Sequence, residues 1–457
     1  MKAGSKQNIS TALFGAFMFF QLCVLGLGNH AGEGLIRSED RELIYYGFQA
    51  LVIAGFFGFA FSECRLKGKA RKCLTAACLA VTGAGALIMY FTDASAVMYI
   101  ISAFAVMPFL GCMGGAVYLR MSRETAAGER TALKMGIGCA AAVAVQYLLQ
   151  LRWGVTPLLP VFMLAVLALI GFTLYSEPEA PARGSTGETT SRSLIFACLI
   201  AAAFILFISF YNGYIHHLQI KTGYTSYNVY SWPRLMQIPC YLLFAFIGDR
   251  RQGRLVPIAA LCITLTALLN SVLTGSSGAY SLNMCLFYCA VAAAASYYNL
   301  TFWRLAGGTK RPALWAPMGR VLDSIMVLFT GGLGISRLSP AAALSLNMFA
   351  LAVIIVIMAV SGALNLKSSL EPEAPSPVSE ETAFERLREQ FALTPRETQV
   401  LRELVLTEDK QAAISNRLSI SVRVMQKYVT SLYKKTGAET RSGLAELYRK
   451  ALLGKRQ

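Results

Sequence analysis

The amino-acid sequence predicts an all-α protein in which a polytopic bundle of about twelve membrane-spanning helices is followed by a small four-helix domain. Hydrophobic residues make up 55% of the 457 residues and charged residues only 15%, whereas soluble domains carry about 25% charged residues. Apolar runs long enough to cross a bilayer as helices recur along most of the chain. The last quarter is much more polar, which indicates a separate soluble domain.

Each predicted span is an apolar run with few charges and with scattered Gly and Pro residues, which membrane helices tolerate. At 1.5 Å per residue, about twenty residues cover the roughly 30 Å hydrocarbon core of a bilayer. The first run lacks a convincing cleavage site, so it is interpreted as a span and not as a signal peptide. The twelve predicted spans are 9–28, 43–61, 73–91, 96–119, 135–151, 157–175, 194–212, 232–248, 255–273, 281–303, 313–335 and 341–364.

Basic residues are concentrated in alternate loops, which predicts the orientation of the bundle. With the N-terminus inside, the inner segments carry nineteen Lys and Arg residues and the outer loops carry five. Cytoplasmic loops are enriched in Lys and Arg, so this bias favours an inside N-terminus. An even number of spans returns the C-terminus to the same side. We therefore expect a multi-pass protein of the cell membrane with both termini in the cytoplasm.

The spans divide into two sets of six at a polar loop, residues 176–193. In each half, the loop between the second and third spans has an acid, a base, a Gly and a further base. The first copy runs from Glu63 to Lys69, and the second reads Asp249-Arg250-Arg251-Gln252-Gly253-Arg254. This pattern resembles the cytoplasmic loop signature of major facilitator transporters, Asp-Arg-x-Gly-Arg, although the first copy is degenerate and the second has one extra residue. The resemblance implies two parallel repeats around a central cavity.

Residues 366–381, KSSLEPEAPSPVSEET, form a predicted linker. Its prolines, Ser/Thr residues and glutamates make a poor helix and a good flexible connection. At about 3.1 Å per residue, an extended proline-rich chain of this length reaches roughly 50 Å. The predicted organisation is a membrane domain over 1–365, the linker over 366–381, and a C-terminal domain over 382–457.

The C-terminal domain has the pattern of short soluble helices. Thr394, Pro395 and Glu397 are typical of a helix start, with Thr as the cap, Pro in the first turn and Glu as the capping-box partner. A second helix is predicted over 410–418, and a third over 422–436 that stops at Gly437. A fourth begins near residue 440. A short helix, a tight turn at 419–421 and a longer helix make the helix-turn-helix arrangement.

In this region the sequence resembles the LuxR-type DNA-binding domain over about 60 residues. The third helix also carries a basic, hydrogen-bonding face, and such side chains hold phosphates and read base edges. The alternative is a basic helical module that binds protein. The resemblance is carried by Leu393-Thr394-Pro395-Arg396-Glu397, Val400-Leu401, Ile414, Arg417-Leu418, Ile420-Ser421, Val429, Lys434-Lys435 and Gly437.

The LuxR resemblance implies double-stranded DNA as a partner and a homodimer through the fourth helix. The chain departs from the family pattern at Glu408, Ala413, Val424 and Gln426, which bears on the DNA sequence read and on affinity. By the resemblance, Gln426, Lys427 and Thr430 read bases and Arg423, Tyr428 and Lys434 lie nearer the DNA backbone; Ser431 belongs to the same polar face.

Charged residues inside spans are energetically costly and mark candidate functional positions. Arg320 and Asp323 lie three residues apart in the eleventh span, so they share a helix face and can pair. Arg234 lies near the start of the eighth span. One interpretation is a cavity lining that binds an anionic or polar ligand. The other is a structural ion pair together with an arginine that extends its charge to the interface.

The sequence contains no phosphate-binding loop, no HExxH or G-x-S-x-G motif and no kinase signature, so we expect no enzyme activity and no cofactor. No CxxC pair occurs among the eleven cysteines, and no metal site is predicted. The favoured interpretation is a membrane-bound one-component transcriptional regulator, whose membrane domain senses an unknown small molecule and controls DNA binding by the tail. The alternative is a major-facilitator-type transporter of a small solute with a regulatory tail.

Overall fold

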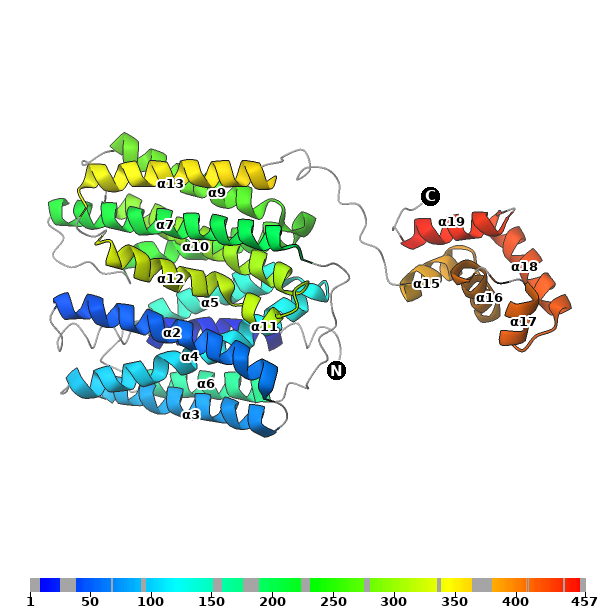
Figure 1. The fold of residues 1–457 in the computed structure, drawn as a ribbon, viewed down its shortest axis with the longest axis horizontal. Helices are drawn as coiled ribbons and strands as arrows, with labels where there is room; N and C mark the ends of the chain where they lie inside the picture. Colours follow the sequence, from blue (N-terminus) through cyan, green and yellow to red (C-terminus); the bar gives the residue numbers. More distant parts are fainter. Residues whose placement is uncertain are drawn as a thin grey trace. The chain divides into compact units, whose positions relative to one another are not determined.

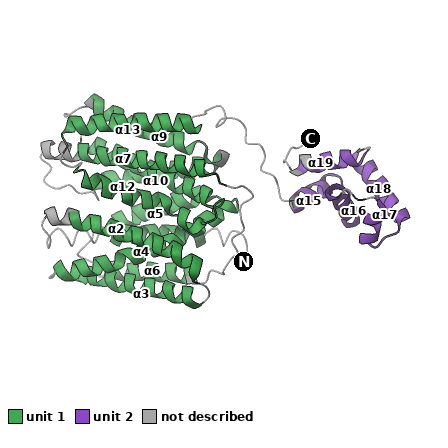
Figure 2. Cartoon of the chain, viewed as in Figure 1, with its two compact units in different colours: residues 1–369 green, residues 370–457 purple. Residues whose placement is uncertain are grey.

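The computed structural model of the chain is helical in every regular element that it describes. The chain forms two compact units, Met1–Ser369 and Leu370–Gln457, which Figure 2 colours separately. The described residues are 9–24, 38–66, 69–91, 96–150, 158–175, 189–222, 231–274, 280–334, 338–363, 380–407, 409, 411–438 and 440–452.

The first unit is a bundle of long helices that lie side by side (Figure 1). Eight of its described helices are long and apolar enough to cross a membrane. The chain is therefore a multi-pass membrane protein, as the composition predicts. The bundle consists of an apolar helix over Ile9–Val24 and of α2 Ser38–Arg65, α3 Lys69–Phe91, α4 Ala96–Ala126, α5 Thr131–Gln150, α6 Leu158–Tyr175, α7 Ser191–Thr222, η1 Trp232–Met236, α8 Gln237–Gly248, η2 Arg250–Gly253, α9 Val256–Thr274, α10 Tyr280–Ala306, α11 Pro312–Trp315, α12 Met318–Gly332 and α13 Pro340–Ser361.

Each of the twelve predicted spans overlaps a described helix. Four of these helices are shorter than the rest: Ile9–Val24, α6, α8 and α12. The last two are short because the chain breaks within the span. Pro233 lies in the 3-10 turn before α8, and Pro317 separates α11 from α12. Proline lacks the backbone N–H that continues a helix, so breaks at these points are expected.

The bundle has an N-terminal half, residues 9–175, and a C-terminal half, residues 191–361. Within the N-terminal half α2 packs along α4, and α3 packs against α4 and α6. Within the C-terminal half α7 packs along α13 and α10. The main contacts between the halves are α5 with α8 and α2 with α12. These two helix pairs flank the space in which residues of both halves meet.

Glycines allow α2 and α4 to pack with their backbones close together. A Cβ atom on Gly55 would lie 2.0 Å from the carbonyl oxygen of Pro108, and one on Gly111 would lie 2.3 Å from that of Val52. Small residues commonly permit such close approach of membrane helices, where apolar packing alone gives little driving force. The position of α2 therefore depends on the absence of a side chain at residue 55.

We expect Gly55→Ala to destabilise the membrane unit by about 1–3 kcal/mol or more, because backbone atoms must move to admit the methyl group. Gly58→Ala is the matched control, since a Cβ atom on Gly58 of the same helix would meet nothing within 4 Å. Thermal unfolding of the two purified variants in the same detergent measures the difference. Equal melting temperatures would show that α2 and α4 are not packed as described.

The C-terminal unit contains five described helices: α15 Glu380–Gln390, α16 Pro395–Leu406, α17 Gln411–Arg417, α18 Val422–Thr436 and α19 Arg441–Leu452. The last four correspond to the predicted helices, and α15 corrects the prediction of four. Helix α15 was difficult to predict, because its polar residues resemble those of the linker. Phe384 of α15 stacks on Tyr448 of α19, with ring centroids 4.6 Å apart, and this contact joins α15 to the unit's core.

A single buried carboxylate connects α16 to α18. Glu397 is 4% exposed and completes the predicted capping box with Thr394. Its Oε2 atom accepts hydrogen bonds from the Thr394 backbone nitrogen at 2.7 Å and from Lys435 Nζ at 2.7 Å. Its Oε1 atom accepts from Ser431 Oγ at 2.6 Å. Burial alone would raise the pKa of Glu397, but the hydrogen bonds from Lys435, Ser431 and Thr394 outweigh burial and lower this pKa to about 2.

The low pKa of Glu397 links the stability of the unit to pH. Because the folded pKa lies below the unfolded value of 4.5, the contribution is complete above pH 4.5 and is lost as the pH falls toward 2. A shift of this size corresponds to about 3 kcal/mol. We expect Glu397→Gln to speed amide hydrogen exchange in α18 of the full-length protein by roughly 100-fold at pH 7. Glu389→Gln, an exposed carboxylate on α15, is the control, and equal exchange in both variants would contradict the assignment.

Candidate functional site

The predicted ion pair forms at the start of α12. Arg320 Nη1 lies 2.5 Å from Asp323 Oδ2, and the side chains are 19% and 26% exposed. The spacing of three residues places both groups on one helix face. Arg320 Nη1 also donates to the hydroxyl oxygen of Tyr298 on α10, at 3.4 Å. The sequence therefore predicted the pairing correctly, and the structure adds a tyrosine as a third member.

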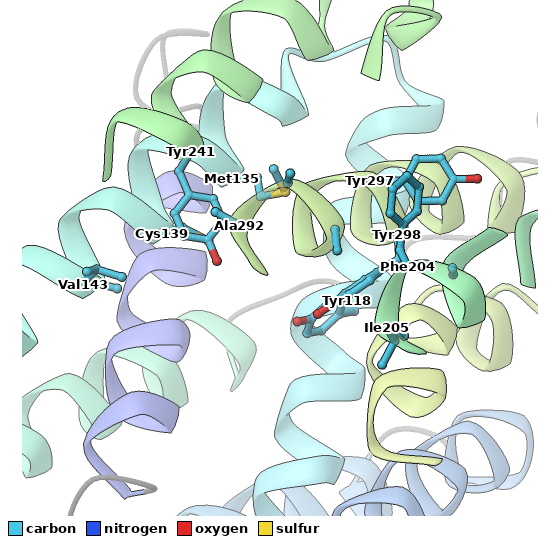
Figure 3. Packing of buried hydrophobic residues seen from close by; sticks show 14 of the residues in the cluster. Tyr118, Met135, Cys139, Val143, Phe204, Ile205, Tyr241, Ala292, Tyr297 and Tyr298 are labelled. Carbon is cyan, nitrogen blue, oxygen red and sulfur yellow. The ribbon is translucent and has the colours of Figure 1, made fainter. Parts of the chain in front are cut away.

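Side chains from both halves surround this pair. Tyr118 of α4 is within electrostatic range of Arg320, Tyr298 and Asp323. Cys139 of α5 lies near Arg320, and Tyr241 of α8 lies near Cys139 and Tyr298. Figure 3 shows Tyr241 beside Cys139, and the side chains of Tyr118 and Tyr298 extending toward one another. The N-terminal half supplies Tyr118 and Cys139, and the C-terminal half supplies the others.

These residues lie at one level of the bundle. Tyr118 and Tyr298 each lie eight residues before the end of their helices, at Ala126 and Ala306. Cys139 lies eight residues after the start of α5. At 1.5 Å per residue, eight residues place each group about 12 Å from its helix end. The cluster is therefore a polar site inside the bundle at the meeting of the two halves.

The buried hydrogen-bonding groups that lack a partner among the described residues include the Tyr118 hydroxyl and the indole N–H of Trp303. Their rings lie 5.8 Å apart, and the Phe14 ring lies 5.3 Å from that of Trp303. Buried polar groups are normally satisfied, so such groups require an explanation. Aromatic faces beside unused hydroxyl and N–H groups suit a ligand with both apolar surface and oxygen atoms.

A hydrogen bond between the halves lies beside the ion pair. Ser324, the residue after Asp323, donates from Oγ to Gln49 Oε1 of α2 at 2.7 Å, and both side chains are buried. Further along, a Cβ atom on Gly331 of α12 would lie 2.1 Å from the ring of Tyr46 of α2. The α2–α12 contact is thus close-packed at one point and hydrogen-bonded at another. Any movement of one half against the other must change this packing or break this hydrogen bond.

The second copy of the loop signature closes one end of the α5–α8 contact. Asp249 accepts hydrogen bonds from the backbone nitrogens of Ala132 and Leu133, each at 2.8 Å, at the start of α5. A negative charge at a helix N-terminus is favourable, because free N–H groups and the helix dipole meet it there. Arg304 donates to the Gly248 carbonyl oxygen at 2.6 Å. Ser122 of α4 donates to the Trp303 carbonyl oxygen of α10 at 2.9 Å. We call this region the Asp249 end.

The backbone conformation and the packing of this loop both require glycine at the signature position. Gly253 has φ of +69°, and a Cβ atom there would lie 1.9 Å from the Arg304 guanidinium. The first copy is built differently. Glu63 forms ion pairs with Arg71 at 3.2 Å and Arg123 at 3.0 Å. The two copies therefore differ in what their acid contacts: a helix terminus in one case, and arginine side chains in the other.

Arg234 is not a member of this cluster, because it lies on a different element and has different neighbours. It belongs to η1, is 6% exposed, and lies within electrostatic range of Cys23 in the first helix. Its burial does not fit an arginine that extends into the membrane interface. The structure thus unites two of the three predicted ligand-binding residues, Arg320 and Asp323, and places Arg234 elsewhere.

The predicted DNA-contacting residues lie on α18. Two of them make contacts within the unit and the other five are exposed. Ser431 donates a hydrogen bond to Glu397, and Tyr428 packs partly against the core. Thr430 donates from Oγ1 to the Gln426 carbonyl oxygen at 2.9 Å. The exposed group consists of Arg423, Gln426, Lys427, Thr430 and Lys434.

The membrane unit resembles solved transporters of the major facilitator fold. The human organic anion transporter MFSD10 (TETRAN) matches with a TM-score of 0.57 and 14% identity, over 79% of this chain and 100% of that one. The major facilitator transporter FucP in an outward conformation matches with a TM-score of 0.52 and 13% identity, over 78% and 98%. The proton:xylose symporter XylE bound to 6-bromo-6-deoxy-D-glucose matches with a TM-score of 0.50 and 14% identity, over 82% and 97%. At these identities the match establishes the fold.

No sequence family and no curated protein matches the chain. The fold comparison corrects the interpretation as a LuxR-type transcriptional regulator. That interpretation gave most weight to about 60 residues of the tail, whereas the fold of about four fifths of the chain is that of transporters. The comparisons support neither the predicted DNA partner nor the predicted homodimer. The solved structures that share this fold are transporters, and this agrees with the expectation that the chain is not an enzyme.

Sequence reasoning missed the aromatic and hydroxyl members of the site. It singled out Arg320 and Asp323 because charges stand out in apolar spans. Tyr118, Tyr298 and Trp303 did not stand out, because aromatic residues also serve at membrane interfaces and in helix packing. The available signal for Tyr118 and Tyr298 was their position eight residues before a helix end, but it becomes useful only once the helices are placed side by side.

Proposed function

We propose that the protein transports a small polar solute across the membrane and binds it between the two halves, at Tyr118, Trp303, Tyr298 and the Arg320–Asp323 pair. The observation that carries this proposal is the pair of unpartnered buried groups, Tyr118 hydroxyl and Trp303 N–H, beside an ion pair. The transporter fold of the membrane unit supports it.

The charges of the site favour a neutral, hydroxyl-rich solute. Arg320 is balanced by Asp323 at 2.5 Å, so the site carries no net charge from this pair. A solute hydroxyl both donates and accepts hydrogen bonds, and it can therefore bridge a tyrosine hydroxyl and an indole N–H. The solved structures with this fold include transporters of an organic anion and of sugars. An organic anion is the second candidate, and it requires Arg320 to be released in part from Asp323.

The orientation and the tail complete the proposal. Twelve spans with both termini in the cytoplasm are supported by the excess of basic residues in alternate loops. The division into a membrane domain over 1–365, a linker over 366–381 and a C-terminal domain over 382–457 is supported by the composition of these segments. We assign the C-terminal domain the role of a regulatory tail, because it has a hydrophobic core of its own. DNA binding forms no part of this role.

Solute-dependent stabilisation of the purified protein tests the binding site. L-fucose and D-xylose serve as neutral probes and benzoate as an anionic probe. We expect a neutral probe to raise the melting temperature of the wild type and to lose this effect in Tyr118→Phe. That variant removes only a hydroxyl that has no hydrogen-bond partner among the described residues. Tyr99→Phe, on the same helix, should retain the response. Stabilisation that survives in Tyr118→Phe would move the binding site elsewhere, and stabilisation by benzoate alone would favour the anion.

A further inference from the structure

An apolar groove lies on the exposed face of the N-terminal half, and none of its lining residues belongs to the proposed solute site. It is a groove of about 620 Å³ between α3 and α6. Both helices line it with small and larger apolar residues, among them Ala76, Ala80 and Ala84 of α3, and Leu164, Ala168 and Phe172 of α6. We infer that this groove holds one acyl chain of an anionic phospholipid, with the phosphate bound at Lys69 and Lys72.

Glycines form the floor of the groove and small side chains keep it open. A Cβ atom on Gly83 would lie 3.1 Å from Leu167, and one on Gly171 would lie 2.5 Å from Leu79. These contacts hold α3 and α6 close together along the floor. Ala76, Ala80 and Ala84 are exposed above it. Because the groove faces outward from a membrane bundle, hydrocarbon surrounds it, and an acyl chain is the occupant with matching chemistry.

The length of the groove fits one leaflet. The lining of α3 runs from Ala76 to Leu87, which is about 16 Å at 1.5 Å per residue. Half of the roughly 30 Å hydrocarbon core is about 15 Å. An acyl chain that follows the groove therefore ends near the bilayer midplane, and its headgroup emerges at the N-terminal end of α3.

Positive charge lies where that headgroup emerges. Lys72, Ala76, Ala80 and Ala84 recur every four residues and so share one face of α3. Lys69 lies in the same first turn, and both lysines are exposed. Basic residues at the membrane surface attract anionic headgroups, so the lysines favour an anionic lipid over a zwitterionic one.

Native mass spectrometry of the full-length protein tests this inference. The probes are phosphatidylglycerol and phosphatidylcholine with identical acyl chains. We expect the wild type to retain phosphatidylglycerol, and Ala80→Phe/Ala84→Phe, which fills the groove, to retain about tenfold less. Lys69→Ala/Lys72→Ala should lower the preference for phosphatidylglycerol over phosphatidylcholine by about tenfold. The matched controls are Ala77→Phe, an exposed residue of α3 outside the groove, and Lys310→Ala, an exposed lysine elsewhere.

Three results would overturn the inference. Undiminished lipid retention in the filled variant would place the lipid elsewhere. Equal retention of both lipids by the wild type would remove the role of the lysines. A dimer that is lost only in the filled variant would assign the groove to a second copy of the chain. None of these results depends on the solute site, so the proposed transport function stands or fails separately.

Discussion

Asp323→Leu is expected to destabilise the membrane unit by about 3 kcal/mol, because it leaves Arg320 as an uncompensated charge inside the bundle. Arg320→Leu should destabilise the unit similarly, because it leaves Asp323 as the uncompensated charge. The double variant Arg320→Leu/Asp323→Leu should recover most of the lost stability, since an apolar pair of similar size needs no compensation. Solute binding should be lost in all three variants. Thermal unfolding, with and without the neutral probes, measures both quantities.

The pattern across these three variants separates a functional pair from a purely structural one. A double variant that is stable but unresponsive to solute means that the pair serves binding. A double variant that is stable and still stabilised by solute would leave the pair with a structural role only. Glu385→Leu, which breaks the exposed pair between Glu385 and Arg388 in the tail, is the control and should change stability little.

Asp249→Asn is expected to open the Asp249 end of the bundle. The carboxylate accepts two backbone hydrogen bonds from the start of α5, and hydrogen bonds to a charged group contribute about 1.5–3 kcal/mol. Their loss should favour states in which α5 and α8 separate by roughly 10- to 100-fold. Cys139, which is 2% exposed and lies along this contact, should then react faster with N-ethylmaleimide. Peptide mapping by mass spectrometry measures the rate at each cysteine.

Two controls make the Asp249 result specific. Glu63→Gln alters the corresponding acid of the other half, which contacts arginines and not a helix terminus. It should therefore increase the rate of reaction at Cys139 much less than Asp249→Asn does. Cys262, which is already exposed, provides an internal reference. Equal acceleration at every buried cysteine would indicate unfolding, and no acceleration at Cys139 would show that Asp249 does not hold this end closed.

The sequence was sufficient for the membrane architecture, because hydrophobic length and charge are local properties. Each predicted span contains a helix, and the fold agrees with the resemblance drawn from the two loop copies. The helix start at Thr394 and the stop at Gly437 were equally local, and each is present. The breaks at Pro233 and Pro317 follow from the chemistry of proline.

The site could be predicted only in part, because it depends on contacts between distant segments. Arg320 and Asp323 are three residues apart, so their pairing follows from helix geometry. Tyr118 and Trp303 are far apart in the sequence, on helices of different halves. Only the packing of α4 on α10 brings their ring centroids to 5.8 Å. The functional interpretation was wrong because a local motif in the tail outweighed the fold of the much larger membrane unit.

The most direct test of the central claim is uptake into proteoliposomes of the probe that most stabilises the purified protein. The account predicts uptake by the wild type at a rate well above that of empty liposomes. It also predicts loss of uptake in Tyr118→Phe and in the Arg320→Leu/Asp323→Leu variant, and unchanged uptake in Tyr99→Phe. Stabilisation by the probe without any uptake would contradict the account, because the membrane unit would then bind its solute without carrying it across.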